Sequence, residues 1–273
     1  IVSPIAVRIV PEKARPLALM MIATGTSIAI ILGLPLGRII GLTIGWRMTF
    51  LCIGIFATSI AIYLGFCLPK VPSRGGFSFR QLPQLLRNKP LVRLYIFTLL
   101  VVTGYYTGYS YIEPFMGQVA HLSENMITTT LMVFGIMGII GSFAYSRFYP
   151  KRPYLFMCVA ILIITTCLSS LGLAASIPVL AMAICGFWGM AVNGFNVAMQ
   201  QEVIDNSSTE ATAVAMSIYS GIYNLGIGSG TFLGGAVCTY LSISHIGYIG
   251  GTIVFAGLLF WLIKVIRSRI IGI

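Results

Sequence analysis

Eight long apolar runs constrain this chain more than any other feature of its sequence. Each run has about 18 or more residues with few or no charges, which is the length a helix needs to cross a bilayer. The runs lie at 17–40, 48–67, 92–116, 126–146, 154–173, 177–200, 212–239 and 246–263. Because an open strand would leave its backbone polar groups unpaired in lipid, we predict that all eight are transmembrane helices.

Composition excludes the main classes of water-soluble protein. Apolar residues make up 58% of the 273 residues and charged residues only 8%, whereas a soluble domain carries about 25% charged residues. A soluble enzyme, a secreted disulfide scaffold and a disordered protein are therefore excluded. The fold class that we predict is an all-α, polytopic membrane helix bundle.

The six cysteines indicate packing rather than chemistry. They lie within or at the ends of the predicted spans, and the sequence has no C-x-x-C pair and no histidine beside a cysteine. Small buried apolar side chains are the ordinary role of such residues. We expect no metal, no cofactor and no enzymatic activity.

The basic residues predict an orientation. There are 17 Lys and Arg residues against 6 Asp and Glu, a net charge of +11. Fifteen of the 17 lie in connections on one side of the predicted bundle, namely Arg8, Lys13, Arg15, Lys70, Arg74, Arg80, Arg87, Lys89, Arg93, Arg147, Lys151, Arg152, Lys264, Arg267 and Arg269. By the positive-inside rule this side and the C-terminus are cytoplasmic. The basic balance is therefore a topology signal, and we expect no nucleic-acid partner.

A linker and a repeat predict the domain organisation. Residues 68–91 form the longest polar connection, so we predict a truncated N-terminal part at 1–67 and a six-helix half at 92–273. The first run holds Gly33-x-Pro35-x-Gly37-x-x-x-Gly41, and the seventh holds Gly226-x-Gly228-x-Gly230-x-x-x-Gly234. This spacing lets helix backbones approach closely. It indicates an internal repeat, although chance agreement of two small-residue patterns is the alternative.

Several stretches carry a resemblance to a known family. They are Pro11-Glu-Lys-Ala-Arg15, Ala23-Thr-Gly-Thr26, Gly33-Leu-Pro-Leu-Gly-Arg38, Gly45-Trp-Arg-Met-Thr-Phe50, Tyr109-Ser-Tyr-Ile-Glu-Pro-Phe115 and Ser220-Gly-Ile-Tyr-Asn-Leu-Gly-Ile-Gly228. The chain resembles the drug–proton antiporter group of the major facilitator superfamily. Within that group it is most similar to the bacterial sugar efflux transporters that export arabinose, related sugars or thiogalactosides.

The resemblance implies a twelve-helix fold made of two six-helix halves in a bacterial inner membrane. It also implies sugar and protons as partners, exchanged in opposite directions across the bilayer. Gly33, Pro35, Gly37 and Gly41 match the glycine-rich antiporter motif, and residues 141–152 match the second-half basic loop without its acidic position. The expectation that follows is a chain holding eight of the twelve helices.

Polar residues within the spans are the candidate substrate contacts. Thr103, Tyr106 and Ser110 fall on one arc of the third run, opposite a Gly104-x-x-x-Gly108 face. The remaining candidates are Asn193, Asn196 and Asn224. Hydroxyls and amides can form hydrogen bonds with a neutral polyol such as a sugar. The alternative to substrate binding is that these groups are buried between helices. Trp188 is interpreted as a packing residue that could instead stack on a sugar ring.

Glu113 is the single acidic residue within a predicted span, and such carboxylates are candidates for function. It lies about 30 Å along the helix from Val92, near the outer surface. We predict a structural or gating role, in which Glu113 caps a helix end or pairs with Arg38, with proton coupling as the alternative. Glu202, Asp205 and Glu210 are interpreted as a solvated cytoplasmic turn.

Two alternative functions remain open at the level of sequence. The first is a multidrug or amino-acid exporter of the same superfamily, against which the uncharged polar stripes argue. The second is a truncated membrane fragment that does not transport, because a central site between two halves needs helices from both.

Overall fold

The computed structural model describes residues 36–67, 87–208 and 211–271, together with Pro11, Ala14, Met21, Ala29 and Gly33; for 264–271 it describes the backbone. The chain divides into two compact units, Ile1–Gly76 and Phe77–Ile273, which we treat separately. Most of the predicted 17–40 span, Pro35 within it, and most of the 68–91 linker lie outside the described residues.

In the first unit, a helical segment at 36–43 is followed by α3 (Trp46–Cys67). Gly45 joins the two with φ +102°, a backbone conformation that side chains with a Cβ rarely adopt. The Thr49 side chain contacts both Gly37 and Gly41, because their missing Cβ atoms would lie 3.7 and 3.6 Å from it. Its hydroxyl donates a hydrogen bond to the Gly37 carbonyl at 3.3 Å.

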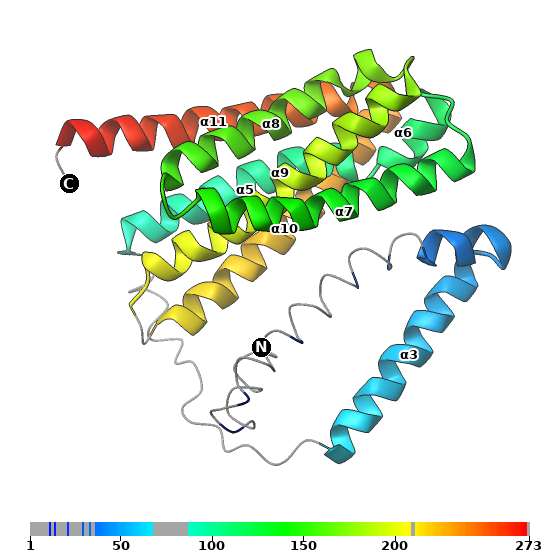
Figure 1. The fold of residues 1–273 in the computed structure, drawn as a ribbon, viewed down its shortest axis with the longest axis horizontal. Helices are drawn as coiled ribbons and strands as arrows, with labels where there is room; N and C mark the ends of the chain where they lie inside the picture. The colour runs from blue at the N-terminus through cyan, green and yellow to red at the C-terminus, as the bar shows by residue number, and fades with distance from the viewer. Residues whose placement is uncertain are drawn as a thin grey trace. The chain divides into compact units, whose positions relative to one another are not determined.

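The second unit is a helix bundle in which consecutive long helices run in opposite directions (Figure 1). Its elements are α5 (Lys89–Tyr109), α6 (Ile112–Gln118), α7 (Glu124–Phe148), α8 (Pro153–Ala174), α9 (Pro178–Asp205), α10 (Thr212–Tyr240), the short η3 (Ile243–His245) and α11 (Ile246–Ile271). Proline occupies the first turn of α5, α8 and α9, where its missing N–H costs nothing. The described residues contain no strand, and the predicted all-α membrane fold class is confirmed.

Within the described residues, six helical segments are long and apolar enough to cross a membrane. They are α3, α5 with α6, α7, α8, α9, and η3 with α11 up to Ile263. The predicted 212–239 span forms α10, which is long enough at 29 residues but less apolar. Six glycines and several hydroxyl side chains lower its mean hydropathy. These small residues allow close contact with neighbouring helices.

The predicted 92–116 span is two helices rather than one. α5 ends at Tyr109 and α6 begins at Ile112. Pro114 explains the break, because it has no N–H to donate to the Ser110 carbonyl and its ring would clash with that carbonyl in a continuous helix. At the junction the Tyr111 N–H donates instead to the Gly108 carbonyl at 3.2 Å, which tightens the turn.

Glycine contacts determine how the helices of the second unit approach one another. A Cβ on Gly230 would lie 2.5 Å from the Thr103 carbonyl of α5, and one on Gly234 would lie 2.6 Å from the Thr107 carbonyl. Gly250 of α11 meets the Gly104 backbone in the same way. Similar contacts join α7 to α9 and α8 to α11, involving Gly141 with Met190, Gly189 with Phe134, and Gly247 with Leu168.

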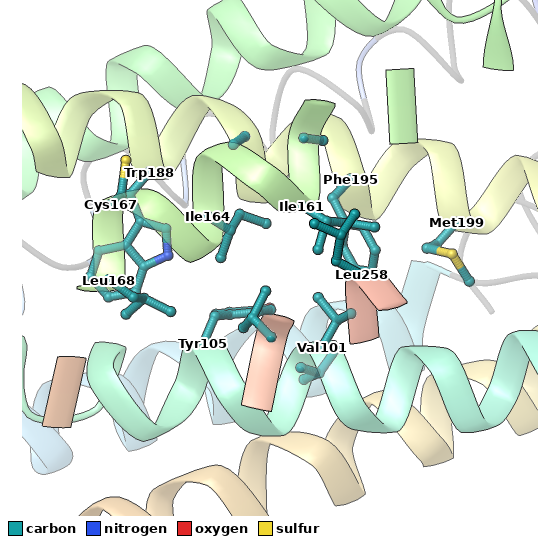
Figure 2. Close-up of a cluster of buried hydrophobic side chains, with 14 of the residues drawn as sticks. Val101, Tyr105, Ile161, Ile164, Cys167, Leu168, Trp188, Phe195, Met199 and Leu258 are labelled. Carbon is teal, nitrogen blue, oxygen red and sulfur yellow. The ribbon is translucent and has the colours of Figure 1, made fainter. Parts of the chain in front are cut away.

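These contacts place the helices in the spatial order α7, α9, α8, α11, α5, α10, and α10 also touches α9. The largest buried side chains lie at the centre, among α5, α8, α9 and α11. Figure 2 shows this core, which includes Val101, Ile161, Ile164, Leu168, Trp188, Phe195 and Leu258. The bundle therefore has an apolar centre, and a group of polar contacts lies beside it where α5, α9 and α10 meet.

We predict that Gly230→Ala lowers the melting temperature of the purified protein. The added methyl group must push the α5 backbone away, and such overpacking costs about 1–3 kcal/mol. Gly228→Ala is the matched control, because a Cβ there meets no described atom within 4 Å and alanine favours a helix by about 1 kcal/mol over glycine. Equal melting temperatures for the two variants would contradict the close α5–α10 contact.

Candidate functional site

Hydroxyl and amide groups from three helices meet where α5, α9 and α10 converge. The Tyr105 hydroxyl of α5 and the Tyr223 hydroxyl of α10 share a short hydrogen bond. The Tyr219 hydroxyl of α10 donates to Asn196 Oδ1 of α9 at 3.1 Å. Gln200 Nε2 donates to the same oxygen at 3.3 Å. The predicted contact residue Asn196 thus belongs to a hydrogen-bonded network across α9 and α10.

Aromatic rings extend this network along α5. The Tyr105 and Tyr106 rings are 4.7 Å apart between centroids, and the Tyr106 and Tyr109 rings are 5.5 Å apart in an edge-to-face arrangement. We call these three residues with Tyr219 and Tyr223 the tyrosine cluster. Sequence reasoning found Tyr106 but missed the other four, because their mutual contacts depend on how three helices pack.

Trp188 packs against the tyrosine cluster. Its side chain is fully buried and meets the Tyr109 and Phe134 rings edge to face, at 6.0 and 5.7 Å between centroids. Gly108 leaves room for it, since a Cβ there would lie 3.5 Å from the indole ring. Its Nε1 has no hydrogen-bond partner among the described residues. Full burial of both faces leaves no ring surface on which a sugar could stack.

The predicted α5 contacts lie along the seam with α10. Thr103 and Tyr106 are half-buried there, with the Thr103 carbonyl and the Tyr106 Cβ against Gly230. Ser110 is exposed, and its hydroxyl forms a hydrogen bond of 2.7 Å with the Thr231 hydroxyl. The structure therefore brings Tyr106 into the tyrosine cluster and leaves Ser110 accessible at the end of α5.

One face of α9 carries a stripe of small and polar residues, namely Gly186, Gly189, Asn193, Asn196 and Gln200, and much of this stripe lies against α7. Gly186 and Gly189 lie against side chains and backbone of α7, and the half-buried Asn193 lies against Gly138. Asn196 and Gln200, one and two turns further on, reach the α10 side instead. The helix thus divides its stripe between a glycine-mediated contact and the hydrogen-bonded network.

α10 carries an exposed polar face on the side away from its glycine contacts. Ser217, Ser220 and Asn224 are exposed there, and a Cβ added to Gly221 or Gly228 would meet no described atom within 4 Å. Asn224 Nδ2 donates to the Ser220 carbonyl at 2.8 Å. An asparagine side chain has a second N–H and an acceptor oxygen besides, so this residue can still bind a ligand.

The two charged candidates lie in different units. Glu113 is half-buried in the first turn of α6, where the free N–H groups of a helix start favour a carboxylate. Arg38 is buried to 8% exposure in the first unit. Each unit supplies one member of the predicted pair, and the pairing stays a prediction.

The acidic turn after α9 is not simply solvated. Glu202 belongs to the last turn of α9, is only 9% exposed, and accepts a hydrogen bond from the Tyr149 hydroxyl at 2.9 Å. Burial, together with the charge of Glu202, raises the pKa of Tyr149, so the phenol keeps its proton and donates at any physiological pH. The interpretation of Glu202 as a solvated loop residue was wrong, because α9 continues five residues past the predicted span.

Replacing Asn196 should destabilise the protein more than replacing Asn224. In Asn196→Ala the Tyr219 hydroxyl and the Gln200 amide lose their common acceptor, which costs about 1–3 kcal/mol per unsatisfied buried group. Asn224→Ala is the control, because this exposed side chain bonds within its own helix and its loss should change stability by less than about 0.5 kcal/mol. Thermal unfolding in detergent compares the two, and a smaller effect for Asn196→Ala would contradict the network.

Comparisons with known proteins agree with this architecture. A relative from Mannheimia succiniciproducens, described as a probable sugar efflux transporter, is 40% identical over 271 residues, which are 99% of this chain and 68% of the relative. Two crystal structures of a bacterial homologue of the human lysosomal transporter Spinster, both inward-facing, share the fold. The unoccupied form has TM-score 0.69 at 15% identity, and the occupied form 0.66 at 16%; they match 96% of this chain and 73% and 72% of theirs.

A family model identifies the superfamily of this chain. The model described as the Major Facilitator Superfamily matches residues 1–220, which include the first unit, α5 to α9 and the start of α10. The multi-pass helical architecture and the 40% identical relative agree with this match. This protein therefore belongs to the Major Facilitator Superfamily and is a membrane transporter, not an enzyme.

Proposed function

We propose that this transporter exports sugars of the arabinose or thiogalactoside type in exchange for protons. The name of the Mannheimia relative suggests that the substrate is a sugar. Alternating access of two six-helix halves around a central site, the arrangement in related transporters, supplies the mechanism. On this proposal the protein lies in the bacterial inner membrane with its basic connections and C-terminus in the cytoplasm.

One observation supports a sugar as the substrate, namely the absence of charge from the polar surfaces of α5, α9 and α10. The sequence has no charged residue at 94–109, 178–201 or 212–240, which make up nearly all of these helices. Their polar groups are phenols, hydroxyls and amides, which both donate and accept hydrogen bonds as sugar hydroxyls do. A cationic drug or an amino acid would instead favour a site with charged partners, because burying an unpaired charge is costly.

Six residues are the proposed sugar contacts. Ser110 and Asn224 are exposed at the α5–α10 side of the second unit, whereas Thr103, Tyr106, Asn193 and Asn196 are half-buried. Exposed polar groups on a membrane protein need partners other than lipid. We place Ser110 and Asn224 at the surface that sugar first meets, with the half-buried residues shaping the site behind them.

Glu113 and Arg38 are the proposed gating pair. Glu113 follows the break between α5 and α6, near the end of the helix that is remote from the basic connections. A charge pair there can hold the outer side closed and release it during the cycle. Proton transfer by Glu113 is the competing assignment for the same carboxylate.

A transport panel tests the substrate class. Everted membrane vesicles from cells expressing the open reading frame that encodes this chain should accumulate arabinose or a thiogalactoside when a proton gradient is imposed. Asn224→Ala should lower sugar accumulation roughly 3- to 10-fold, the worth of one hydrogen bond, while the protein stays folded. Accumulation of a cationic dye or an amino acid without any sugar would contradict the proposal.

A double-mutant comparison tests the gate. Glu113→Gln and Arg38→Gln should each impair proton-driven efflux, because each leaves the buried or half-buried charge of the other residue without its partner. The double variant should recover efflux, since both charges are then removed and no unpaired charge remains. If Glu113→Gln abolishes driven efflux but keeps downhill sugar exchange, and the double variant shows no recovery, Glu113 carries the proton and the gating assignment fails.

A further inference from the structure

An apolar groove runs between α7, α8 and α9, away from the tyrosine cluster. It encloses about 590 Å³, which lies within the range of roughly 300–1,000 Å³ that small-molecule sites occupy. Its walls include Phe148, Leu155, Phe156 and Val159. Gly141 and Gly194 form part of its lining, where the α7 and α9 backbones approach closely.

The groove ends at two cations. Lys151 and Arg152 line it, and both side chains are exposed in the turn between the end of α7 at Phe148 and the start of α8 at Pro153. The acids nearest this end of the bundle, Glu202 and Asp205, line a different pocket with Tyr149 and Tyr154. The groove is therefore amphipathic, with a long apolar wall and a positively charged mouth.

The position of the groove in the membrane indicates which kind of ligand would fit it. α7, α8 and α9 are membrane-spanning helices, so the mouth lies at a membrane–water interface and the apolar wall at acyl-chain depth. Phe148, Leu155 and Val159 are exposed, so the groove is accessible from the side on which lipid lies. Basic pockets between transmembrane helices favour anionic lipid head groups.

We propose that this groove is a binding site for an anionic phospholipid. The phosphate lies against Lys151 and Arg152, and one acyl chain lies along the walls formed by α7 and α8. A free anion would leave the apolar wall unused, and a neutral lipid would leave the two cations unmatched. The 68–86 segment of the chain carries only basic charges, so charge complementarity favours a negatively charged occupant over this segment.

Lipid binding to the purified full chain tests the site. Native mass spectrometry follows titration with phosphatidylglycerol, with phosphatidylcholine as the neutral probe. Lys151→Ala with Arg152→Ala should weaken phosphatidylglycerol binding about 30-fold, from about 1 kcal/mol for each cation near a membrane surface. Both side chains are exposed, so this variant should fold, and its melting temperature checks that it does.

Two further variants separate a specific site from general attraction. Arg87→Ala with Lys89→Ala removes the same charge at the same end of the bundle but outside the groove, and should leave phosphatidylglycerol binding unchanged. Val159→Trp fills the groove from its exposed wall with both cations kept, and should reduce binding. Equal loss in the Arg87/Lys89 variant, unchanged binding in Val159→Trp, or equal affinity for phosphatidylcholine would each overturn the proposal.

Discussion

Close backbone contact at glycine holds this bundle together. Between membrane helices there is little hydrophobic driving force, since lipid is as apolar as a side chain, so packing contacts at small residues and interhelical hydrogen bonds supply the attraction. Gly104 against Gly250 brings α5 to α11, and Gly230 against the Thr103 carbonyl brings α10 to α5. Removing one of these glycines must separate two helix backbones, and no side chain can rotate to relieve that contact.

The glycine contacts also determine where the polar groups point. With Gly226, Gly230 and Gly234 facing α5, helical periodicity directs Tyr219 and Tyr223 inward and Ser220 and Asn224 outward. Tyr223 shares a hydrogen bond with Tyr105 and Tyr219 donates one to Asn196, so the inward tyrosines rigidify the junction of α5, α9 and α10. The outward residues keep hydrogen-bonding capacity free, as a surface that meets a polar substrate requires.

Local sequence information predicted the membrane helices and the fold class but not the contacts among helices. Apolar runs located α3 and α7 to within a few residues, because length and hydropathy alone define a membrane span. The break before Pro114 and the buried carboxylate of Glu202 were missed, since the first needs local geometry and the second a partner 53 residues away. Tyr105 and Tyr223 are separated by 118 residues, so no periodicity in one helix could have paired them.

On the proposed function, the outward face of α10 borders a water-filled sugar path rather than lipid. Thiol labelling of Asn224→Cys, in a background whose six native cysteines are replaced, tests it most directly, with Phe232→Cys, an exposed apolar position on α10, as the control. A water-soluble reagent should label residue 224 rapidly and residue 232 slowly, and sugar should protect residue 224. Labelling of residue 224 only by a lipid-soluble reagent, without protection by sugar, would contradict the account.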